Sequence, residues 1–360
     1  MITLQSDDFA ERMTQQVNSR PALYSVQYAV TYRCNVACVH CYAHDADVGA
    51  PPKLAMDEVR RIFREAADLG CLHCTVTGGE PLLHPEFETI WTILAELGIR
   101  RLLFTNATLA TDRVAGFLRD MPPDWVEVTL LGADAATHEA ITRRPGSFDA
   151  ALAGIRRLER AGVRVRVKTI VMRNNAHQIG EIKALAETLG DGSFRLDGQL
   201  MGDYRGCLDI DSLRVPVEDL VRLENLHGMS TEEAWCHEET RLAGFRRDRL
   251  YACGAGRRSA YLSPWGGLHP CLSAAHIACS LREHSVSDAW RILGETLTAR
   301  SFPADHPCRD CDAFVYCQNC PAAAKLDTGD ERGISSYRCK LAKARQKRFS
   351  SSASKRSGEC

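Results

Sequence analysis

The amino-acid sequence predicts an α/β fold with a parallel sheet, followed by a smaller cysteine-rich domain. Between residues 26 and 200, short β-rich runs alternate with segments of helical periodicity, which is typical of parallel strands joined by crossover helices. Helix-ending glycines such as Gly70, Gly98 and Gly162 separate many of these segments. After Cys253 the alternation gives way to cysteine, glycine and proline, which indicates a second domain with a different kind of core.

The order of the elements follows from these runs. Strands are expected at residues 26–32, 74–77, 101–105, 125–131, 163–172 and 194–200. Helices are expected at residues 56–69, 86–97, 112–119, 148–161 and 177–189. These strands are too few for a complete (β/α) barrel.

Residue composition and charge divide the chain into successive segments. We expect an N-terminal extension at 1–25, the strand–helix part at 26–200, a helical connector at 201–250, the cysteine-rich domain at 251–345, and a basic, Ser-rich tail at 346–360. The connector holds two charged helical segments, at 218–226 and 231–245. The composition of the tail predicts disorder.

Composition excludes several classes of function. The chain has 360 residues, is 45% hydrophobic and carries a net charge of -1, so no global field attracts nucleic acid or a membrane surface. It has no apolar run long enough to span a membrane and no secretory signal, which predicts a cytoplasmic protein. Ten of its 16 cysteines fall into ligand-like spacings and are therefore expected to bind metal clusters rather than to form disulfides, whereas Cys71 and Cys74 are expected to pack in the core.

The first cysteine group is Cys34, Cys38 and Cys41, in the spacing C-x3-C-x2-C. Three neighbouring thiolates can hold three irons of a 4Fe-4S cube and leave one iron open to another ligand. An incomplete zinc site and ordinary buried cysteines are the alternatives.

This spacing resembles the signature of the radical S-adenosylmethionine (radical SAM) superfamily. The resemblance implies a partial (β/α)6 barrel with its active site at the C-terminal ends of the strands. It also implies that the open iron chelates SAM and that the reduced cluster cleaves SAM to a 5′-deoxyadenosyl radical. Gly78, Gly79, Glu80 and Pro81 match the Gly-Gly-Glu-Pro motif that holds the SAM amino group in this superfamily.

Other contacts to SAM are implied by the same resemblance. Thr105 and Asn106 end the third expected strand, where relatives place ribose contacts, although a solvent-facing turn explains Asn106 equally well. Thr129 lies on the next strand, and Arg143 is the better of two neighbouring arginines for a carboxylate contact. His40 is a candidate for packing on adenine. The sequence does not indicate which residue acts as a catalytic acid or base.

The second cysteine group resembles the SPASM domain, which holds two auxiliary 4Fe-4S clusters in many radical SAM enzymes. Its members are Cys253, Cys271, Cys308, Cys311, Cys317, Cys320 and Cys339. The resemblance assigns the first cluster to Cys253, Cys271 and Cys320, with Cys279 as a remote candidate for a fourth ligand, and the second cluster to the other four. The last spacing is x2 where relatives have x3, which weakens the assignment of Cys320. A single zinc site would use four cysteines and leave three without a role.

These resemblances point to a peptide-modifying radical SAM/SPASM enzyme that forms a cross-link or oxidises a ribosomally synthesised precursor peptide. The expected partners are that peptide, an electron donor such as flavodoxin or ferredoxin, and a separate leader-binding protein, because few residues precede the first strand. The alternatives are a radical SAM/SPASM enzyme acting on a small-molecule natural-product or cofactor precursor, and a non-enzymatic metal-binding module.

Overall fold

The computed structural model describes residues 22–353, apart from 44, 45, 47, 48, 228–230, 243, 244, 318 and 319. Most of the expected N-terminal extension and the last residues of the expected tail therefore lie outside the described residues. Within them, one mixed sheet has the strand order β6-β5-β4-β3-β2-β1-β7-β8-β9. Its strands are β1 (Ser25–Ala29), β2 (His73–Thr77), β3 (Arg100–Thr105), β4 (Trp125–Thr129), β5 (Val165–Ile170), β6 (Phe194–Asp197), β7 (Ser259–Leu262), β8 (Gly267–His269) and β9 (Cys279–Ser280).

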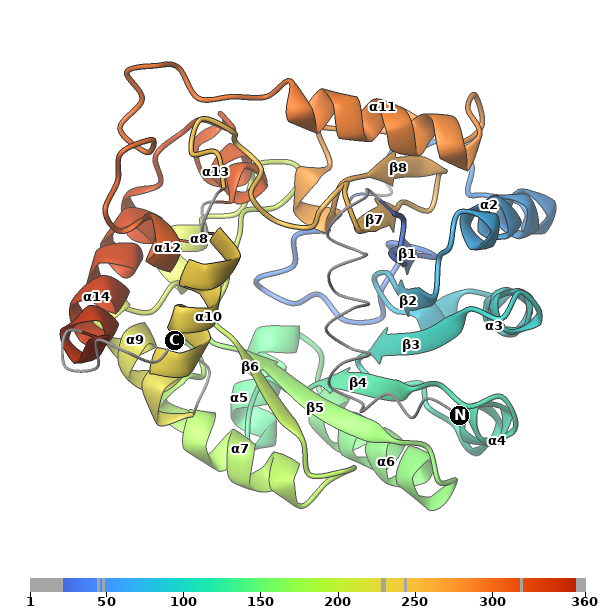
Figure 1. Cartoon of the computed structure of the whole chain (residues 1–360). Helices are drawn as coiled ribbons and strands as arrows, with labels where there is room; N and C mark the ends of the chain where they lie inside the picture. Colours follow the sequence, from blue (N-terminus) through green and yellow to red (C-terminus); the bar gives the residue numbers. More distant parts are fainter. Residues whose placement is uncertain are drawn as a thin grey trace, which may run out of the picture.

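Helices connect these strands and cover the sheet (Figure 1). The first group is α2 (Met56–Asp68), η1 (Pro81–Leu83), α3 (Phe87–Glu96), α4 (Asp112–Asp120), α5 (Ala135–Thr142), α6 (Ser147–Arg160), η2 (Ala176–Gln178) and α7 (Ile179–Glu187). The second group is α8 (Ile210–Leu213), α9 (Val217–Leu226), α10 (Glu232–Leu242), η3 (Leu272–Ala274), α11 (Val286–Thr298), α12 (Phe314–Cys317), α13 (Pro321–Thr328) and α14 (Ser336–Ala353).

The six parallel strands β1 to β6 confirm the predicted strand–helix alternation. Each pairs in parallel with the next, from Val26 opposite Cys74 at one end to Ile170 opposite Asp197 at the other. Because parallel strands end at the same edge, the loops after β1, β2 and β3 and the last residue of β4 come together there. Apart from Arg143, which follows helix α5, the expected site residues of the first half of the chain lie on these segments.

The cysteine-rich region is not separate from the sheet, which corrects the expected division near residue 251. Strand β7 pairs in parallel with β1, and β8 and β9 extend the sheet in antiparallel order. The hairpin covers the edge of β1 that β2 leaves open, and an uncovered edge would expose unpaired backbone groups. The region also contains the long helices α11 and α14, although its glycine and proline content predicted little helix.

The predicted disorder of the C-terminal tail is wrong for the part of the tail that the structure describes. Helix α14 continues to Ala353, so residues 346–353 are helical rather than disordered, while 354–360 lie outside the described residues. Phe349 explains this result, because its side chain is buried and its ring lies 6.2 Å from that of Trp235. Burial of such an aromatic side chain holds the last turns of the helix against α10.

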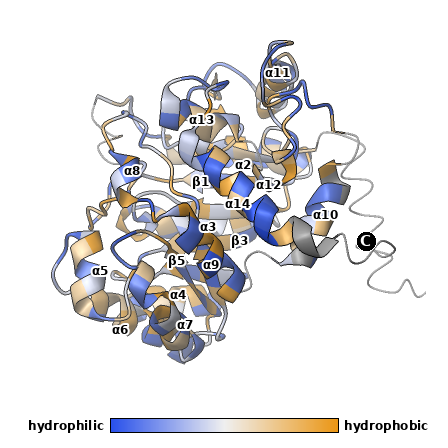
Figure 2. Cartoon of the chain, turned by 90° about the vertical axis from the view of Figure 1, so that its left-hand side faces the viewer, coloured by the Kyte–Doolittle hydropathy of each residue, from blue (hydrophilic) through white to orange (hydrophobic). Residues whose placement is uncertain are grey.

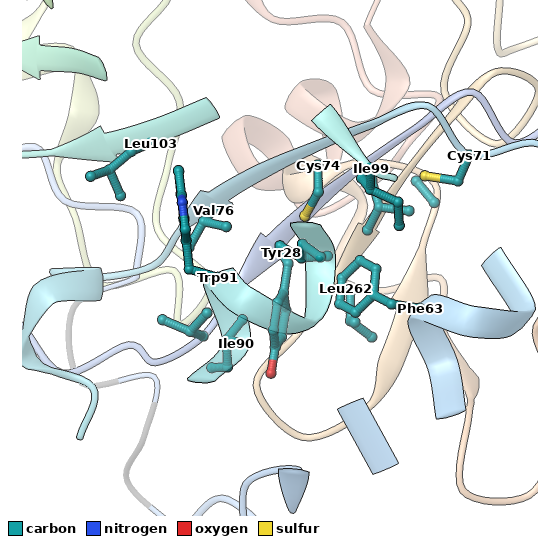
Figure 3. Close-up of a cluster of buried hydrophobic side chains, with 14 of the residues drawn as sticks. Tyr28, Phe63, Cys71, Cys74, Val76, Ile90, Trp91, Ile99, Leu103 and Leu262 are labelled. Atoms are coloured by element: carbon teal, nitrogen blue, oxygen red, sulfur yellow. The ribbon is translucent and has the colours of Figure 1, made fainter. Parts of the chain in front are cut away.

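The main core lies between the sheet and its outer helices. Figure 3 shows Tyr28 of β1 and Trp91 of α3 among aliphatic side chains, with Cys71 and Cys74 in the same cluster. Both cysteines are free and buried, as expected for packing residues. A second core joins α7, α9, α10, α12 and α14. Figure 2 looks onto this side of the molecule and shows hydrophilic and hydrophobic residues alternating along these helices.

No helix within the described residues is long and apolar enough to cross a membrane.

Two helical glycines give a matched test of the packing behind β3. A Cβ on Gly154 of α6 would lie 2.0 Å from the carbonyl oxygen of Ala107, whereas a Cβ on Gly116 of α4 meets nothing within 4 Å. Gly154→Ala should therefore destabilise the chain by roughly 1–3 kcal/mol, because the backbone must shift. Gly116→Ala should stabilise it by about 0.5–1 kcal/mol. Urea unfolding of both variants measures the difference, and equal effects would contradict the close contact.

Candidate functional site

The loop that carries Cys34, Cys38 and Cys41 follows β1 and is held by the end of helix α5. The amide N–H groups of Ala37 and Val39 donate to the carbonyl oxygens of Thr142 and Ile141, both at 2.9 Å. The loop is therefore fixed by backbone hydrogen bonds to a neighbouring element, which can present three side chains in a constant arrangement.

The three thiols of this loop lie close enough to influence one another. Burial, together with the neighbouring Cys41 and Cys34, raises the pKa of Cys38 to about 12. Such thiolates are costly unless a cation compensates their charge, and iron supplies that compensation. In the described part of the chain, no three His, Cys, Asp or Glu side chains are grouped to hold one metal ion. Three thiolates on one loop fit a 4Fe-4S cube, in which each thiolate bonds a different iron.

Gly78 and Gly79 let the chain after β2 pass against the backbone that leads to Cys34. A Cβ on Gly78 would lie 2.2 Å from the carbonyl oxygen of Thr31, and one on Gly79 would lie 2.4 Å from that of Arg33. Gly78 also has a φ of +152°, a backbone angle that residues with a side chain rarely adopt. The N–H of Gly79 donates to the carbonyl oxygen of Thr31 at 2.7 Å, and the N–H of Glu80 donates to the carbonyl oxygen of Arg33 at 2.9 Å. The glycine pair thus joins the second strand end to the base of the cysteine loop.

Glu80 is the fully buried carboxylate of the site, with an exposed fraction of 0%. Its Oε1 accepts hydrogen bonds from the N–H of Leu82 at 3.0 Å and the hydroxyl of Thr105 at 2.7 Å. Its Oε2 accepts one from the N–H of Asn106 at 2.8 Å. Burial raises the pKa of Glu80 to about 7, and these hydrogen bonds oppose the shift. Because a carboxylate oxygen has two lone pairs, Oε2 retains capacity for a further donor such as an ammonium group.

Asn106 connects this carboxylate to the cysteine loop. Its side-chain Nδ2 donates to Asn35 Oδ1 at 2.9 Å and lies 3.9 Å from the sulfur of Cys34. Its Oδ1 accepts from the backbone and hydroxyl of Thr108. The sequence left open whether Asn106 was a simple turn residue, and the structure gives it a place between Glu80 and Cys34.

The remaining expected residues differ in their positions. Pro81 is buried at the first position of η1. Thr129 is half-buried at the end of β4, opposite Lys168 of β5. Arg143 caps helix α5 in the left-handed conformation with its side chain exposed. Its neighbour Arg144 instead donates to the carbonyl oxygen of Asn35 at 2.6 Å, so Arg144 is the arginine that contacts the cysteine loop.

Lys168 of β5 and Asp197 of β6 form a charged pair near the site that the sequence did not indicate. Lys168 Nζ lies 3.4 Å from Asp197 Oδ2, and both charges act on the ring of His40. Burial lowers the pKa of His40 to about 4, and its Nδ1 has no hydrogen-bond partner among the described residues. The alternation of apolar and charged residues in β5, with Arg166 and Lys168 on one face, was the available signal.

Four of the C-terminal cysteines line one pocket of about 260 Å³. They are Cys308, Cys311, Cys317 and Cys339, the set expected for one auxiliary cluster. A water molecule takes up ~30 Å³ in the liquid, so the pocket is much larger than a single ion requires. Apolar groups such as Phe314 and Ala342 also line the pocket and would shield a cluster from solvent.

The other three cysteines also come together. Burial raises the pKa of Cys271 to about 12, with Cys320 and Cys253 as neighbouring thiols. Cys320 caps helix α13 through a hydrogen bond from the N–H of Ala323 at 3.4 Å, and a helix N-terminus favours a thiolate. Cys279 is buried in the main core, and its electrostatic neighbours are Glu283 and Asp288 rather than cluster cysteines. Its candidacy as a fourth ligand therefore receives no support.

Comparison with known proteins agrees with this geometry. The family described as "Radical SAM superfamily" matches residues 28–186. The chain is 25% identical to an AdoMet-dependent heme synthase of Methanosarcina barkeri over 85% of this chain and 93% of that protein. It is 26% identical to the mycofactocin maturase MftC of Mycolicibacterium smegmatis over 84% of this chain and 79% of that protein. Two further AdoMet-dependent heme synthases match over about half of their length.

Solved structures share the fold. SuiB of Streptococcus suis bound to S-adenosylmethionine superposes with a TM-score of 0.66 at 15% identity, covering 95% of this chain and 84% of SuiB. This similarity extends over both cysteine-bearing regions, since it spans nearly the whole chain. Residues 28–186 of the chain thus match the radical SAM superfamily, and the chain has SPASM-type homologues over most of its length.

Proposed function

We propose that this radical SAM enzyme modifies a ribosomally synthesised peptide by forming a cross-link or by oxidation. The observation that carries the proposal is an open pocket whose lining runs from the end of strand β6 to Cys320. Asp197 in this lining acts electrostatically on His40 of the first cysteine loop, and Cys320 belongs to the C-terminal cysteines. A substrate lying in it would be near both.

The pocket has the features that an extended peptide requires. It has a volume of about 400 Å³ and is lined by consecutive residues of β6, including Arg195, Leu196 and Asp197, and by Ser273 on the opposite wall. Strand β6 is the last strand of the sheet, so its outer edge has no neighbouring strand within the part of the chain that the structure describes. A free strand edge can pair with the main chain of an extended peptide, while adjacent side chains select the sequence.

SAM and a 4Fe-4S cluster are the cofactors of a radical SAM enzyme. In our proposal Cys34, Cys38 and Cys41 would hold the cluster, and Glu80 would accept a hydrogen bond from the SAM ammonium group. When bound and reduced, such a cluster would supply the electron for reductive cleavage of SAM, and the radical chemistry that follows would remove hydrogen from the substrate. Thr105 and Asn106 would orient Glu80, and the packed glycine pair would keep the site closed to water.

The C-terminal cysteines would hold two auxiliary 4Fe-4S clusters, one in the four-cysteine pocket and one on Cys253, Cys271 and Cys320. We also expect a low-potential electron donor such as flavodoxin or ferredoxin. These assignments rest on the arrangement of the thiols and on relatives such as SuiB, which has been solved bound to the precursor peptide SuiA.

A tetrapyrrole substrate is the second candidate, because the AdoMet-dependent heme synthase of Methanosarcina barkeri matches over 93% of its length. One experiment distinguishes a peptide substrate from a tetrapyrrole substrate. The anaerobically reconstituted enzyme is given SAM and reductant with either a co-expressed peptide encoded beside its gene or an iron-porphyrin precursor of heme. Mass spectrometry should show loss of hydrogen from the peptide. Formation of heme, with no change in the peptide, would contradict the proposal.

The radical cluster is tested by removal of its ligands. A Cys34→Ala/Cys38→Ala/Cys41→Ala variant should lose about four irons and all reductive cleavage of SAM, because each thiolate holds one iron. A Cys71→Ala variant is the matched control, since Cys71 is a buried free thiol of the core. Iron analysis and chromatography of 5′-deoxyadenosine measure both variants. Continued formation of 5′-deoxyadenosine in the triple variant would show that these three cysteines do not hold the radical cluster.

The role of Glu80 is tested by Glu80→Gln. The substitution removes a charge-assisted partner of the ammonium group worth roughly 1.5–3 kcal/mol, so SAM should bind about 10- to 150-fold more weakly while the cluster remains. Glu96→Gln is the control, because Glu96 is exposed and pairs with Arg60 on the surface. Equilibrium binding of SAM to iron-replete protein gives the comparison. Unchanged affinity would remove Glu80 from the SAM site.

The auxiliary clusters are tested without truncation, because removal of the region after Cys253 would also uncover β1. The reconstituted wild type should bind about twelve irons, as three 4Fe-4S clusters require. A Cys308→Ala/Cys311→Ala variant should bind about eight and lose substrate turnover, while uncoupled cleavage of SAM persists. One zinc with about four irons in the wild type would show that the auxiliary assignment is wrong and leave the radical cluster intact.

A further inference from the structure

A network of buried charges lies between the two C-terminal cysteine sets. Arg214 donates to Asp327 Oδ2 at 2.8 Å, and Arg338 donates to the same oxygen at 2.9 Å. Both arginines also donate to the carbonyl oxygen of Leu200. The Asp327 and Arg214 side chains are 3% and 4% exposed, so water screens this group very little.

A second ion pair continues the network along helix α14. Arg345 forms a two-point ion pair with Glu224 of α9, and the side chains are 7% and 2% exposed. Arg345 also donates to the carbonyl oxygen of Tyr316, the residue before Cys317. This arginine is therefore tied directly to the segment that carries one of the cluster cysteines.

The position of the network relative to the cysteines is defined by one narrow cavity of about 30 Å³. Its lining contains all three arginines together with Cys317 and Cys320. Cys317 also lines the four-cysteine pocket, and Cys320 also lines the pocket beside β6 together with Arg338. The arginines thus stand between the two expected clusters, with Arg338 on the side of Cys320.

The network carries an excess of positive charge. Three arginines face two buried carboxylates, Asp327 and Glu224, which leaves one positive charge within the buried set. Asp211 also pairs with Arg214, but its side chain is 76% exposed and is screened by solvent. An unbalanced buried cation is costly unless a counter-charge lies nearby. Thiolate-ligated iron–sulfur clusters carry net negative charge and would supply it.

We propose that Arg214, Arg338 and Arg345, with Asp327 and Glu224, set the reduction potentials of the auxiliary clusters. The inference rests on the proposed presence of those clusters. Positive charge near a cluster favours its reduced state, because reduction adds negative charge, and so raises the potential. Arg338 acts mainly on the cluster of Cys320, and these residues tune a cofactor rather than act as catalytic residues.

A charge series on the full-length reconstituted protein tests the proposal. Arg338→Gln removes one positive charge, Asp327→Asn removes one negative charge, and the double variant leaves the net charge unchanged. Midpoint potentials are measured by redox titration followed by electron paramagnetic resonance, and addition of SAM identifies the signal of the radical cluster. We expect a lower potential in Arg338→Gln, a higher one in Asp327→Asn, and a potential near that of the wild type in the double variant.

Controls separate charge from damage to the fold. Arg291→Gln on the exposed surface of α11 should shift no potential, and Arg338→Lys should stay near the wild type because it keeps the charge. If Arg338→Gln loses iron, the midpoint potential of Asp327→Asn alone tests the inference, and an upward shift of that potential supports it. Shifts of the same sign in Asp327→Asn and Arg338→Gln, or no shift with about twelve irons bound, would overturn the inference. A wild type with only about four irons would instead overturn the cluster assignment, and the inference with it.

Discussion

The close passage of Gly78 and Gly79 against Thr31 and Arg33 is the contact on which the rest of the site depends. It brings the end of β2 to the base of the cysteine loop, at a distance that no side chain would permit. Glu80 follows at once and is held by donors from β3 and η1. Three strand ends are therefore locked around one buried carboxylate before any cofactor binds, which is the kind of preorganisation that a reactive site needs.

The sheet carries this arrangement into the second half of the chain. Because β7 pairs with β1, the hairpin before Cys271 is built on the same strand that leads to Cys34. Tyr204 adds a second link, since its ring lies 5.3 Å from that of Tyr42, next to Cys41, and its hydroxyl donates to the carbonyl oxygen of Leu272, next to Cys271. The two cysteine-bearing regions thus belong to one packed structure, and the pocket beside β6 reaches Cys320 of the second region.

Sequence periodicity predicted the parallel part of the fold well, because Val-rich strands such as β5 and amphipathic helices such as α6 leave strong local signals. The pairing of β7 with β1 could not be predicted, since two short strands far apart in sequence carry no information about register. The tail helix was missed for a similar reason: Phe349 stabilises it through contact with Trp235, a partner over a hundred residues away. Cysteine spacing identified both cysteine sets, whereas Arg144 and the buried arginines depend on tertiary contacts.

We propose that three separate sets of thiols in this chain hold iron–sulfur clusters, with SAM bound beside Glu80. Anomalous diffraction at the iron edge from anaerobic crystals grown with SAM tests it most directly. The account predicts iron peaks at Cys34, Cys38 and Cys41, in the pocket of Cys308, Cys311, Cys317 and Cys339, and at Cys253, Cys271 and Cys320, with the SAM ammonium group within hydrogen-bonding distance of Glu80. A zinc-edge peak at the C-terminal cysteines, or SAM bound away from Glu80, would contradict it.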